Sequence, residues 1–168
     1  APFDIDHEGR GPESLERALG PRVPVVVLSS RAQNPTGAAI TEKRASDLDR
    51  ILRRRPHALL IEIDDSAAVS GSPLVTVTAG RERWAVVRST SKWLGPDLRV
   101  AVATGDAITV GRLQRRQAVN VRWVSHLLQR LTLALWSDPS SGRHFARTAE
   151  VYAEPRTALI DPLGVHDI

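Results

Sequence analysis

Side chains that could carry chemistry gather in three short segments of the chain, at residues 34–37 (NPTG), 62–66 (EIDDS) and 89–99 (STSKWLGPDLR). The third segment contains Lys92, and a lysine that loses its proton through desolvation can attack a carbonyl carbon as a free amine. Hydroxyl groups beside this lysine and Arg99 after it would suit a phosphate group. In the second segment, strand alternation would place Glu62 and Asp64 on one face, where a carboxylate could point at a ligand.

Each segment taken alone also has an ordinary structural interpretation. Asn, Pro and Gly are common turn formers, so residues 34–37 could be a simple turn. The acidic residues of the second segment could cap a helix or lie in a loop, and Lys92 could be a solvated surface lysine. The elements that precede the segments therefore decide how much weight they carry.

Four apolar runs and several helical patterns organise the rest of the chain. We predict strands at residues 23–29, 58–64, 84–90 and 99–104, helices at 12–19, 41–54, 107–117, 118–136 and 144–163, and a loop or helix N-cap at 137–143. Thr41 would cap the second helix, and Pro155 would kink or interrupt the last one.

This alternation of strands and helices predicts the fold class. Near-continuous apolar strands separated by helices indicate an α/β fold, a three-layer α/β/α sandwich around a mostly parallel sheet. Too few residues separate the third and fourth strands for a helical crossover, so one of them would run antiparallel. Each polar segment follows one of the first three strands, and open α/β sheets bind ligands at the carboxyl ends of their strands.

The composition is that of one soluble globular domain. The 168 residues are 42% hydrophobic and 25% charged, and no apolar run reaches about eighteen residues, so we expect no membrane association and a cytoplasmic location. The absence of cysteine excludes disulfides, thiolate nucleophiles and cysteine-based metal centres, and no metal site is predicted. The net charge of +4 is spread along the chain, which makes basicity weak support for nucleic-acid binding.

The order of the three segments resembles the large domain of the fold-type I pyridoxal-phosphate enzymes, the aspartate aminotransferase superfamily. The stretches AQNPTGAAIT, ERWAVVRSTSKWLGPDLRVAVATGD and WVSHLLQ are most similar to the effector domain of MocR-type regulators of the GntR family, in their vitamin-B6-responsive, PtsJ-like branch. The resemblance covers essentially the whole chain. It implies a class I aminotransferase large domain with pyridoxal 5'-phosphate as its cofactor.

The resemblance also implies roles for the third segment. Lys92 would hold the cofactor as a Schiff base, which needs a neutral amine and therefore a desolvated site. Ser89 and Arg99 would bind the cofactor phosphate, and Ser91 could assist them.

The first segment receives a role from the same resemblance. Asn34 would donate its side-chain amide to the phenolic oxygen of the cofactor. Pro35 would hold the loop that aims this amide. The segment would thus bind the cofactor from the end of the first predicted strand.

The second segment departs from the family pattern, in which Glu-Asp-Asp precedes His or Tyr. Without a gap, the position that pairs with the pyridinium nitrogen falls on Ile63, and the partner of the phenolic oxygen falls on Asp65. A slip of one residue gives the ring-nitrogen role to Asp64 and replaces the His or Tyr by Ser66. We favour Asp64 and Ser66, because Ile63 in that place would weaken the cofactor as an electron sink.

The chain begins at Ala1 and contains no Met, and the resemblance places a winged-helix DNA-binding domain upstream and a small domain downstream. We therefore expect an incomplete large domain that self-associates or is marginally stable by itself. The favoured function is a ligand-sensing domain of a transcription regulator, a homodimer responding to a small amino compound or B6 vitamer. Alternatives are a functional class I/II aminotransferase and a basic α/β domain that binds nucleic acid.

Overall fold

The computed structural model describes residues 4–6, 8–20, 23–34, 36–66, 69–120 and 122–165, with the backbone alone for Arg10, Glu154 and residues 156–165. The strands are β1 (Ile5–Asp6), β2 (Gly9–Arg10), β3 (Val25–Ser29), β4 (Leu59–Asp64), β5 (Trp84–Ser89) and β6 (Ala101–Gly105). The helices are α1 (Pro12–Ala18), α2 (Glu42–Leu52), the 3-10 turn η1 (Pro96–Leu98), α3 (Ala107–Val119), α4 (His126–Ser137) and α5 (Pro139–Val165).

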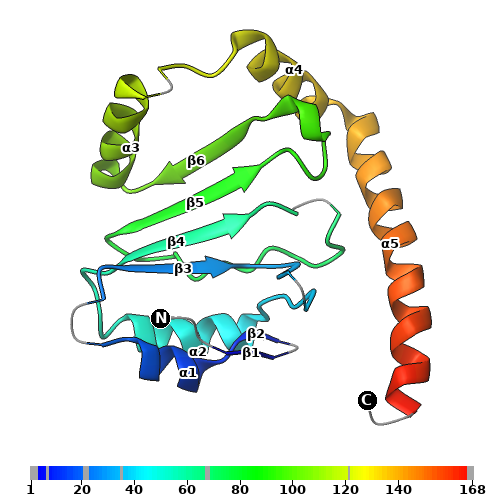
Figure 1. The fold of residues 1–168 in the computed structure, drawn as a ribbon, viewed down its shortest axis with the longest axis horizontal. Coiled ribbons are helices and arrows are strands. Elements are labelled where there is room, and N and C mark those ends of the chain that lie inside the picture. Colours follow the sequence, from blue (N-terminus) through cyan, green and yellow to red (C-terminus); the bar gives the residue numbers. More distant parts are fainter. Residues whose placement is uncertain are drawn as a thin grey trace.

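The main sheet has the strand order β3-β4-β5-β6 and is mixed. Strands β3, β4 and β5 are parallel, and β6 runs antiparallel to β5 (Figure 1). Helix α2 provides the crossover that parallel pairing of β3 and β4 needs, whereas only the short turn η1 lies between β5 and β6. This confirms the predicted α/β class, a mostly parallel sheet with one antiparallel strand and flanking helices.

The core lies between α1, α2 and the β3–β4 part of the sheet. Its fully buried side chains come from α1, β3, α2 and β4: Leu15, Leu28, Leu48, Leu52 and Leu60. The N-terminus of α2 is capped as predicted, because the Arg44 backbone N–H donates to Thr41 Oγ1 at 3.1 Å. This half of the molecule thus buries the apolar residues that face α1 and α2, whereas Val25 and Val27 on the other face of β3 are exposed.

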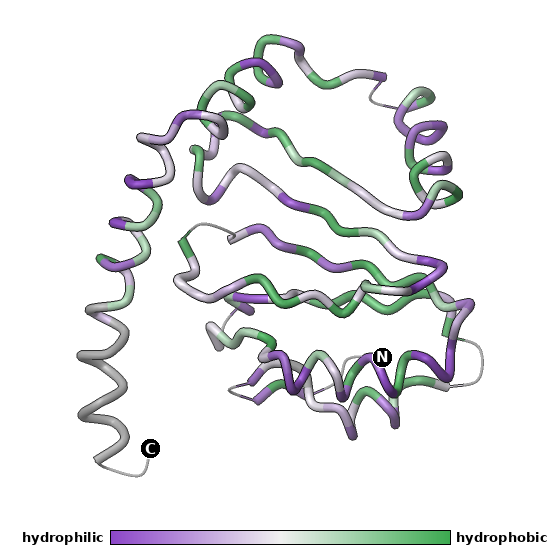
Figure 2. The backbone as a smooth tube through the Cα atoms, turned by 180° about the vertical axis from the view of Figure 1, so that it is seen from behind, coloured by the Kyte–Doolittle hydropathy of each residue, from purple (hydrophilic) through white to green (hydrophobic). Residues whose placement is uncertain are grey.

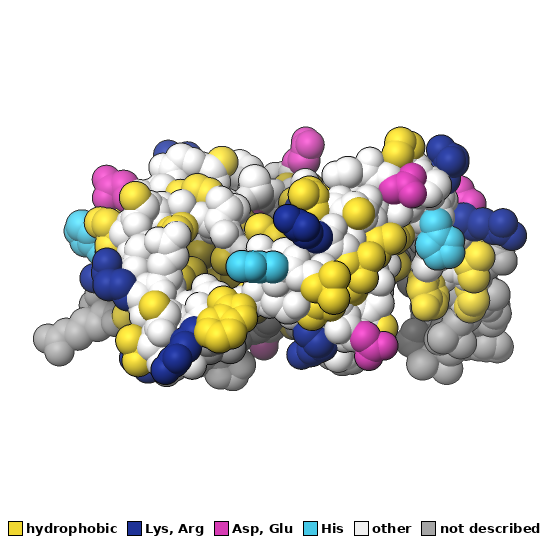
Figure 3. Space-filling view, turned by 90° about the horizontal axis from the view of Figure 1, so that it is seen from above, with side chains coloured by type: hydrophobic (Ala, Val, Ile, Leu, Met, Phe, Trp, Pro, Cys, Tyr) yellow, Lys and Arg dark blue, Asp and Glu magenta, His cyan; other side chains and the backbone are white. Residues whose placement is uncertain are grey.

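The β6 side of the sheet is open by comparison. All four residues from Ala101 to Thr104 are exposed, and among the described residues the only buried side chains on α3 and α4 are Thr109 and Thr132. Hydrophobic residues appear along β6 and α4 in Figure 2, and Figure 3 shows apolar side chains reaching the surface among arginines on this side. No helix within the described ranges is both long and apolar enough to cross a membrane.

The predicted helix over residues 118–136 is wrong in its first part. Helix α3 continues to Val119, and the left-handed backbone of Arg122, with φ of 64°, prevents a continuous helix there. Helix α4 begins only after Ser125, whose side chain accepts the Leu128 N–H. The chain therefore turns between α3 and α4 where periodicity alone predicted one long helix.

Residues 137–143 were predicted to be a loop or a helix N-cap; Asp138 does cap α5, whereas the residues from Pro139 onward are helical and not loop. Helix α5 begins at Pro139, since the first helical position needs no N–H donor. Asp138 supports this start by accepting the Ser140 N–H at 2.8 Å. The helix continues through Pro155 to Val165 instead of being interrupted there.

Candidate functional site

The three polar segments lie where β3, β4 and β5 end. These strands are parallel, so their carboxyl ends share one edge of the sheet, the edge along which α5 runs in Figure 1. The sheet thereby brings together segments that are far apart in the sequence.

Lys92 is paired with an acidic residue of the second segment. Its Nζ lies 2.6 Å from Asp65 Oδ2, and the Lys92 side chain is 51% exposed. Ser66 Oγ donates to the other oxygen, Asp65 Oδ1, at 3.1 Å. The amine is thus ion-paired and half-exposed in this structure, in contrast to the desolvated amine that the resemblance requires.

The three predicted phosphate ligands lie together at the end of β5 and in the turn that follows it. Arg99 Nη1 is 3.5 Å from Ser91 Oγ, which accepts from Ser89 Oγ at 3.4 Å. The turn reaches Arg99 through η1, and Arg99 takes a left-handed backbone with φ of 44°. Trp93 fixes the start of the turn by donating its indole N–H to the Ser89 carbonyl at 2.6 Å. A guanidinium and two hydroxyls thus face the same small region, a donor set that suits an anion.

Asp64 occupies a different environment from Asp65. Its side chain is 1% exposed and binds two arginines that the sequence analysis did not identify. Arg31 donates Nε to Oδ1 at 2.9 Å and Nη2 to Oδ2 at 3.0 Å, and Arg88 Nε lies 3.0 Å from Oδ2. The sequence alone does not reveal the role of Arg88. That role follows from the register of the β4–β5 pair, which places Arg88 opposite Asp64.

Glu62 is a second buried carboxyl on the same face of β4. It accepts from the hydroxyls of Ser30 and Thr76 and from the Val77 backbone N–H. Burial raises the pKa of Glu62 above its usual 4.5, although these hydrogen bonds act in the opposite direction. Glu62 therefore ties the end of β3 to the segment before β5 and has no contact with Lys92 among the described interactions.

The first segment forms an exposed turn. Asn34 is exposed, and its carbonyl accepts from the Gln33 side-chain amide at 3.0 Å. The Gly37 N–H donates to the Gln33 carbonyl at 2.6 Å and closes the turn, with Gly37 at φ of 69°. Pro35 lies outside the described residues. The Asn34 side chain is thus accessible at the end of β3.

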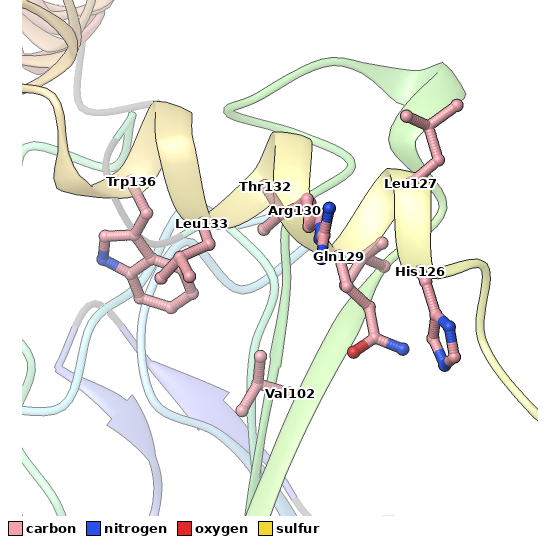
Figure 4. A pocket seen from close by; sticks show the side chains of 9 residues that line it. Val102, His126, Leu127, Gln129, Arg130, Thr132, Leu133 and Trp136 are labelled. Carbon is pink, nitrogen blue, oxygen red and sulfur yellow. The ribbon is translucent and has the colours of Figure 1, made fainter.

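A large cavity lies away from these three segments. It has a volume of about 760 Å³ between β6 and α4 and contains none of the predicted site residues. Figure 4 shows Val102 on β6, and His126 and Gln129 on α4, directed toward the space between strand and helix. Its lining combines aliphatic residues and Trp136 with polar residues such as Arg130, and Leu127 is 75% exposed.

Comparisons with known proteins place this geometry in a family. The family model for aminotransferases of class I and II matches residues 11–167. The vitamin B6 salvage pathway transcriptional repressor PtsJ of Salmonella typhimurium is 40% identical over 100% of this chain and 39% of its own length.

Solved structures agree on the fold. The α-aminoadipate aminotransferase LysN of Thermus thermophilus, solved with N-(5'-phosphopyridoxyl)-L-leucine, matches at 26% identity and a TM-score of 0.80, over 96% of this chain and 43% of that chain. The kynurenine aminotransferase of Pyrococcus horikoshii has a TM-score of 0.84 at 22% identity, over 96% of this chain and 42% of its own. The chain therefore spans roughly two-fifths of the relatives that it matches.

Proposed function

The chain belongs to the aminotransferase class I and II family, and from that premise we propose that it is the pyridoxal-phosphate-binding effector domain of a GntR/MocR-type transcription regulator. The cofactor that this family implies is pyridoxal 5'-phosphate. In the proposal it is joined covalently to Lys92. When bound, it supplies an electron sink to any amino compound joined to it.

The similarity to a named repressor supports a regulatory role. The Salmonella relative is, by its name, a transcriptional repressor of vitamin B6 salvage, and it is 40% identical across the chain. The proposal includes a homodimer in the cytoplasm, DNA binding by a separate domain, and an amino compound or B6 vitamer as effector. Cofactor occupancy would change DNA binding through a shift between two conformational states.

One observation carries the cofactor assignment: Lys92 and an anion-binding group of three side chains occupy the same turn. Ser91 Oγ links the group, because it lies 3.4 Å from Ser89 Oγ and 3.5 Å from Arg99 Nη1. A phosphate accepts hydrogen bonds from such donors, and the amine on the same turn could bond a carbonyl carbon nearby. The residues present therefore fit the cofactor's two binding groups.

Lys92 must leave Asp65 before it can be modified. The 2.6 Å contact is an ion pair of an ammonium and a carboxylate, whereas a nucleophilic amine needs a free electron pair. Separation of this pair and loss of a proton from Nζ therefore precede attachment. Ser66 Oγ, which donates to Asp65 Oδ1, would hold the carboxylate as Lys92 moves away.

Asp64 and Ser66 keep their predicted places near the ring nitrogen and the phenolic oxygen in this proposal. Both oxygens of Asp64 already face guanidinium groups of Arg31 and Arg88. These contacts leave the Asp64 carboxylate less able to pair with a ring nitrogen. A weaker pair favours a domain that binds the cofactor over one that catalyses rapid turnover with it. An aminotransferase is the second candidate, supported by 28% identity to the aminotransferase tdiD of Emericella nidulans over 98% of this chain.

The decisive experiment is a set of absorption spectra of the intact protein after addition of pyridoxal phosphate, followed by borohydride reduction and peptide mapping. The chain contains only two lysines, so Lys43→Ala on the exposed surface of α2 is a matched control for Lys92→Ala. We expect a cofactor band that Lys92→Ala abolishes and Lys43→Ala retains. Reduced cofactor on Lys43, or no lysine-dependent band, would contradict the proposal.

Two further measurements distinguish regulator from enzyme. Arg99→Gln should lower the cofactor affinity about tenfold while leaving the band position unchanged, because a charged hydrogen bond to phosphate is lost. Operator binding that changes with cofactor, without measurable transamination, would support the regulator. Steady transamination with no effect on DNA binding would favour the aminotransferase.

A further inference from the structure

A second cavity lies beside the carboxyl ends of β3 and β5, against the start of α5. Its volume is about 510 Å³, within the usual range for small-molecule sites. Two arginines, Arg31 and Arg88, and three aromatic residues, Trp93, Trp136 and Phe145, are among its lining residues. None of the residues predicted to bind the cofactor lines it.

The buried carboxylate of Asp64 holds both arginines in place. This buried carboxylate binds Nε and Nη2 of Arg31, and Arg31 Nη1 also donates to the Ser72 carbonyl at 2.7 Å. Arg88 is tied to Asp64 only through Nε, at 3.0 Å, and its side chain is 31% exposed. Among the interactions of the described residues, the Nη groups of Arg88 donate no hydrogen bond, so they can serve a ligand.

The aromatic wall is equally fixed. The Trp93 ring meets Trp136 edge to face, with centroids 5.0 Å apart, and meets Phe145 in the same way at 5.1 Å. The hydrogen bond from the Trp93 indole to Ser89 holds this ring in position. Such a cluster offers flat apolar surface to an aromatic ring.

The charge of the cavity selects the ligand. Two guanidiniums and the Asp64 carboxylate leave one positive charge at the inner wall. Asp138 also lines the cavity, but its carboxylate accepts the Ser140 N–H at the start of α5. Hydrogen bonding to Ser140 lowers the pKa of Asp138, and this second carboxylate balances the remaining positive charge, so an anion is favoured only beside Arg88 and not throughout the cavity.

The geometry points to a binding site for a small aromatic carboxylate, with the carboxylate on the Arg88 Nη groups and the ring against Trp93 and Trp136. Successive residues of a strand point to opposite faces, so Arg88 and the neighbouring Ser89 serve different sites. The cavity is thus distinct from the phosphate-binding side chains, but it adjoins the proposed ring-nitrogen site, because Asp64 anchors both of its arginines. Binding at this site does not depend on the cofactor, whereas its use as an effector site rests on the proposed function.

The test uses tryptophan fluorescence of the intact protein, with benzoate as the probe and benzamide and benzylamine as uncharged and cationic analogues. Trp93 and Trp136 line the cavity, so benzoate should change the fluorescence in a saturable way. Benzamide and benzylamine should bind at least about tenfold more weakly, because they lack the charge that Arg88 would bind. Equal affinity for the three compounds would overturn the proposal.

Variants separate this site from its surroundings. Arg88→Gln should lower the benzoate affinity at least about tenfold and bring it to that of benzamide. Arg83→Gln is the matched control, since this arginine precedes the same strand and does not line the cavity. Unchanged benzoate affinity in Arg88→Gln, with native circular dichroism in both variants, would overturn the assignment.

Lys92→Ala keeps the two proposals independent. We expect this variant to lose the cofactor band and to bind benzoate as the unmodified protein does. In the unmodified protein, a cofactor band without benzoate binding would refute only the benzoate site. Benzoate binding without a cofactor band in that protein would refute only the proposed function. Loss of benzoate binding in Lys92→Ala would show that the probe occupies the cofactor site and would also overturn the inference.

Discussion

The β3–β4 side and the β6 side of the sheet, at its two opposite edges, differ in how far their apolar residues are buried. On the β3–β4 side, Leu28, Leu48 and Leu60 are 0% exposed where the sheet packs against α1 and α2, although Val25 and Val27 on the other face of β3 are exposed. On the β6 side, Val102 is 47% exposed and Leu127 on α4 is 75% exposed. Both sides carry hydrophobic residues at regular positions, so hydrophobicity alone does not decide which of them are buried.

The difference teaches where the chain obtains its stability. Free energy from apolar burial is proportional to the area removed from water, and most of that area lies in the β3–β4 side. The predicted cofactor residues stand at the carboxyl ends of β3, β4 and β5 and in the segments that follow these strands. Perturbations of the β3–β4 side should therefore unfold the site, and those of the α4 surface should spare it.

The largest expected effect contrasts one leucine from each side. Leu48→Ala leaves a cavity in the closed core and should lower the free energy of unfolding by about 2–5 kcal/mol. Leu127→Ala, at an exposed position, should change it by less than about 0.5 kcal/mol. Urea unfolding of both variants measures this, and equal losses would remove the distinction between the two sides.

A glycine provides the next contrast, because β6 depends on close backbone approach even though its side chains are exposed. A Cβ on Gly105 would lie 2.5 Å from the Trp84 carbonyl oxygen, so Gly105→Ala should lower stability by about 1–3 kcal/mol. A Cβ on Gly142 in α5 meets nothing within 4 Å, and Gly142→Ala should be neutral or stabilising by up to about 1 kcal/mol. Thermal unfolding compares them, and a harmless Gly105→Ala would argue against the β5–β6 register.

The smallest effects are opposite pH dependences from the two sides. Hydrogen bonding to Thr109 is the main cause that lowers the pKa of Asp106 to about 2. Its stabilising contribution is complete above the unfolded value of about 3.8 and is lost as the pH falls toward 2. After allowance for solvent screening, this amounts to roughly 1–2 kcal/mol. Asp106→Asn should flatten the acid limb of a stability-versus-pH curve, and an unchanged limb would contradict the assignment.

Glu62 should act with the reverse sign. Its pKa is raised by burial, so its contribution is complete below the usual 4.5 and is lost as the pH rises through the raised value. Glu62→Gln should therefore become relatively more stable toward higher pH than the unmodified protein. Denaturation midpoints of both proteins, measured from roughly pH 4 to 8, test this prediction. A difference between the two proteins that does not change with pH would refute it.

Much of the fold followed from local patterns. The apolar runs at 23–29, 58–64 and 84–90 became β3, β4 and β5, because alternation and β-branched side chains act within a few residues. The Thr41 cap could also be predicted from the sequence, because its hydrogen bond joins two residues that are only three positions apart. Hydrophobic periodicity predicted the wrong start for α4. The left-handed backbone at Arg122 ends the helical path there, and no pattern of apolar residues indicates such a turn.

The sequence by itself determined the strands, the order of the three polar segments and the residue types that could bind a phosphate and an aldehyde. Only the tertiary structure decided that Lys92 pairs with Asp65 and that Arg31 and Arg88 enclose Asp64. Secondary structure depends on neighbours along the chain, whereas ion pairs across strands depend on register and on loop paths. A residue pair such as Arg31 and Asp64, 33 positions apart, becomes a contact only when the sheet forms.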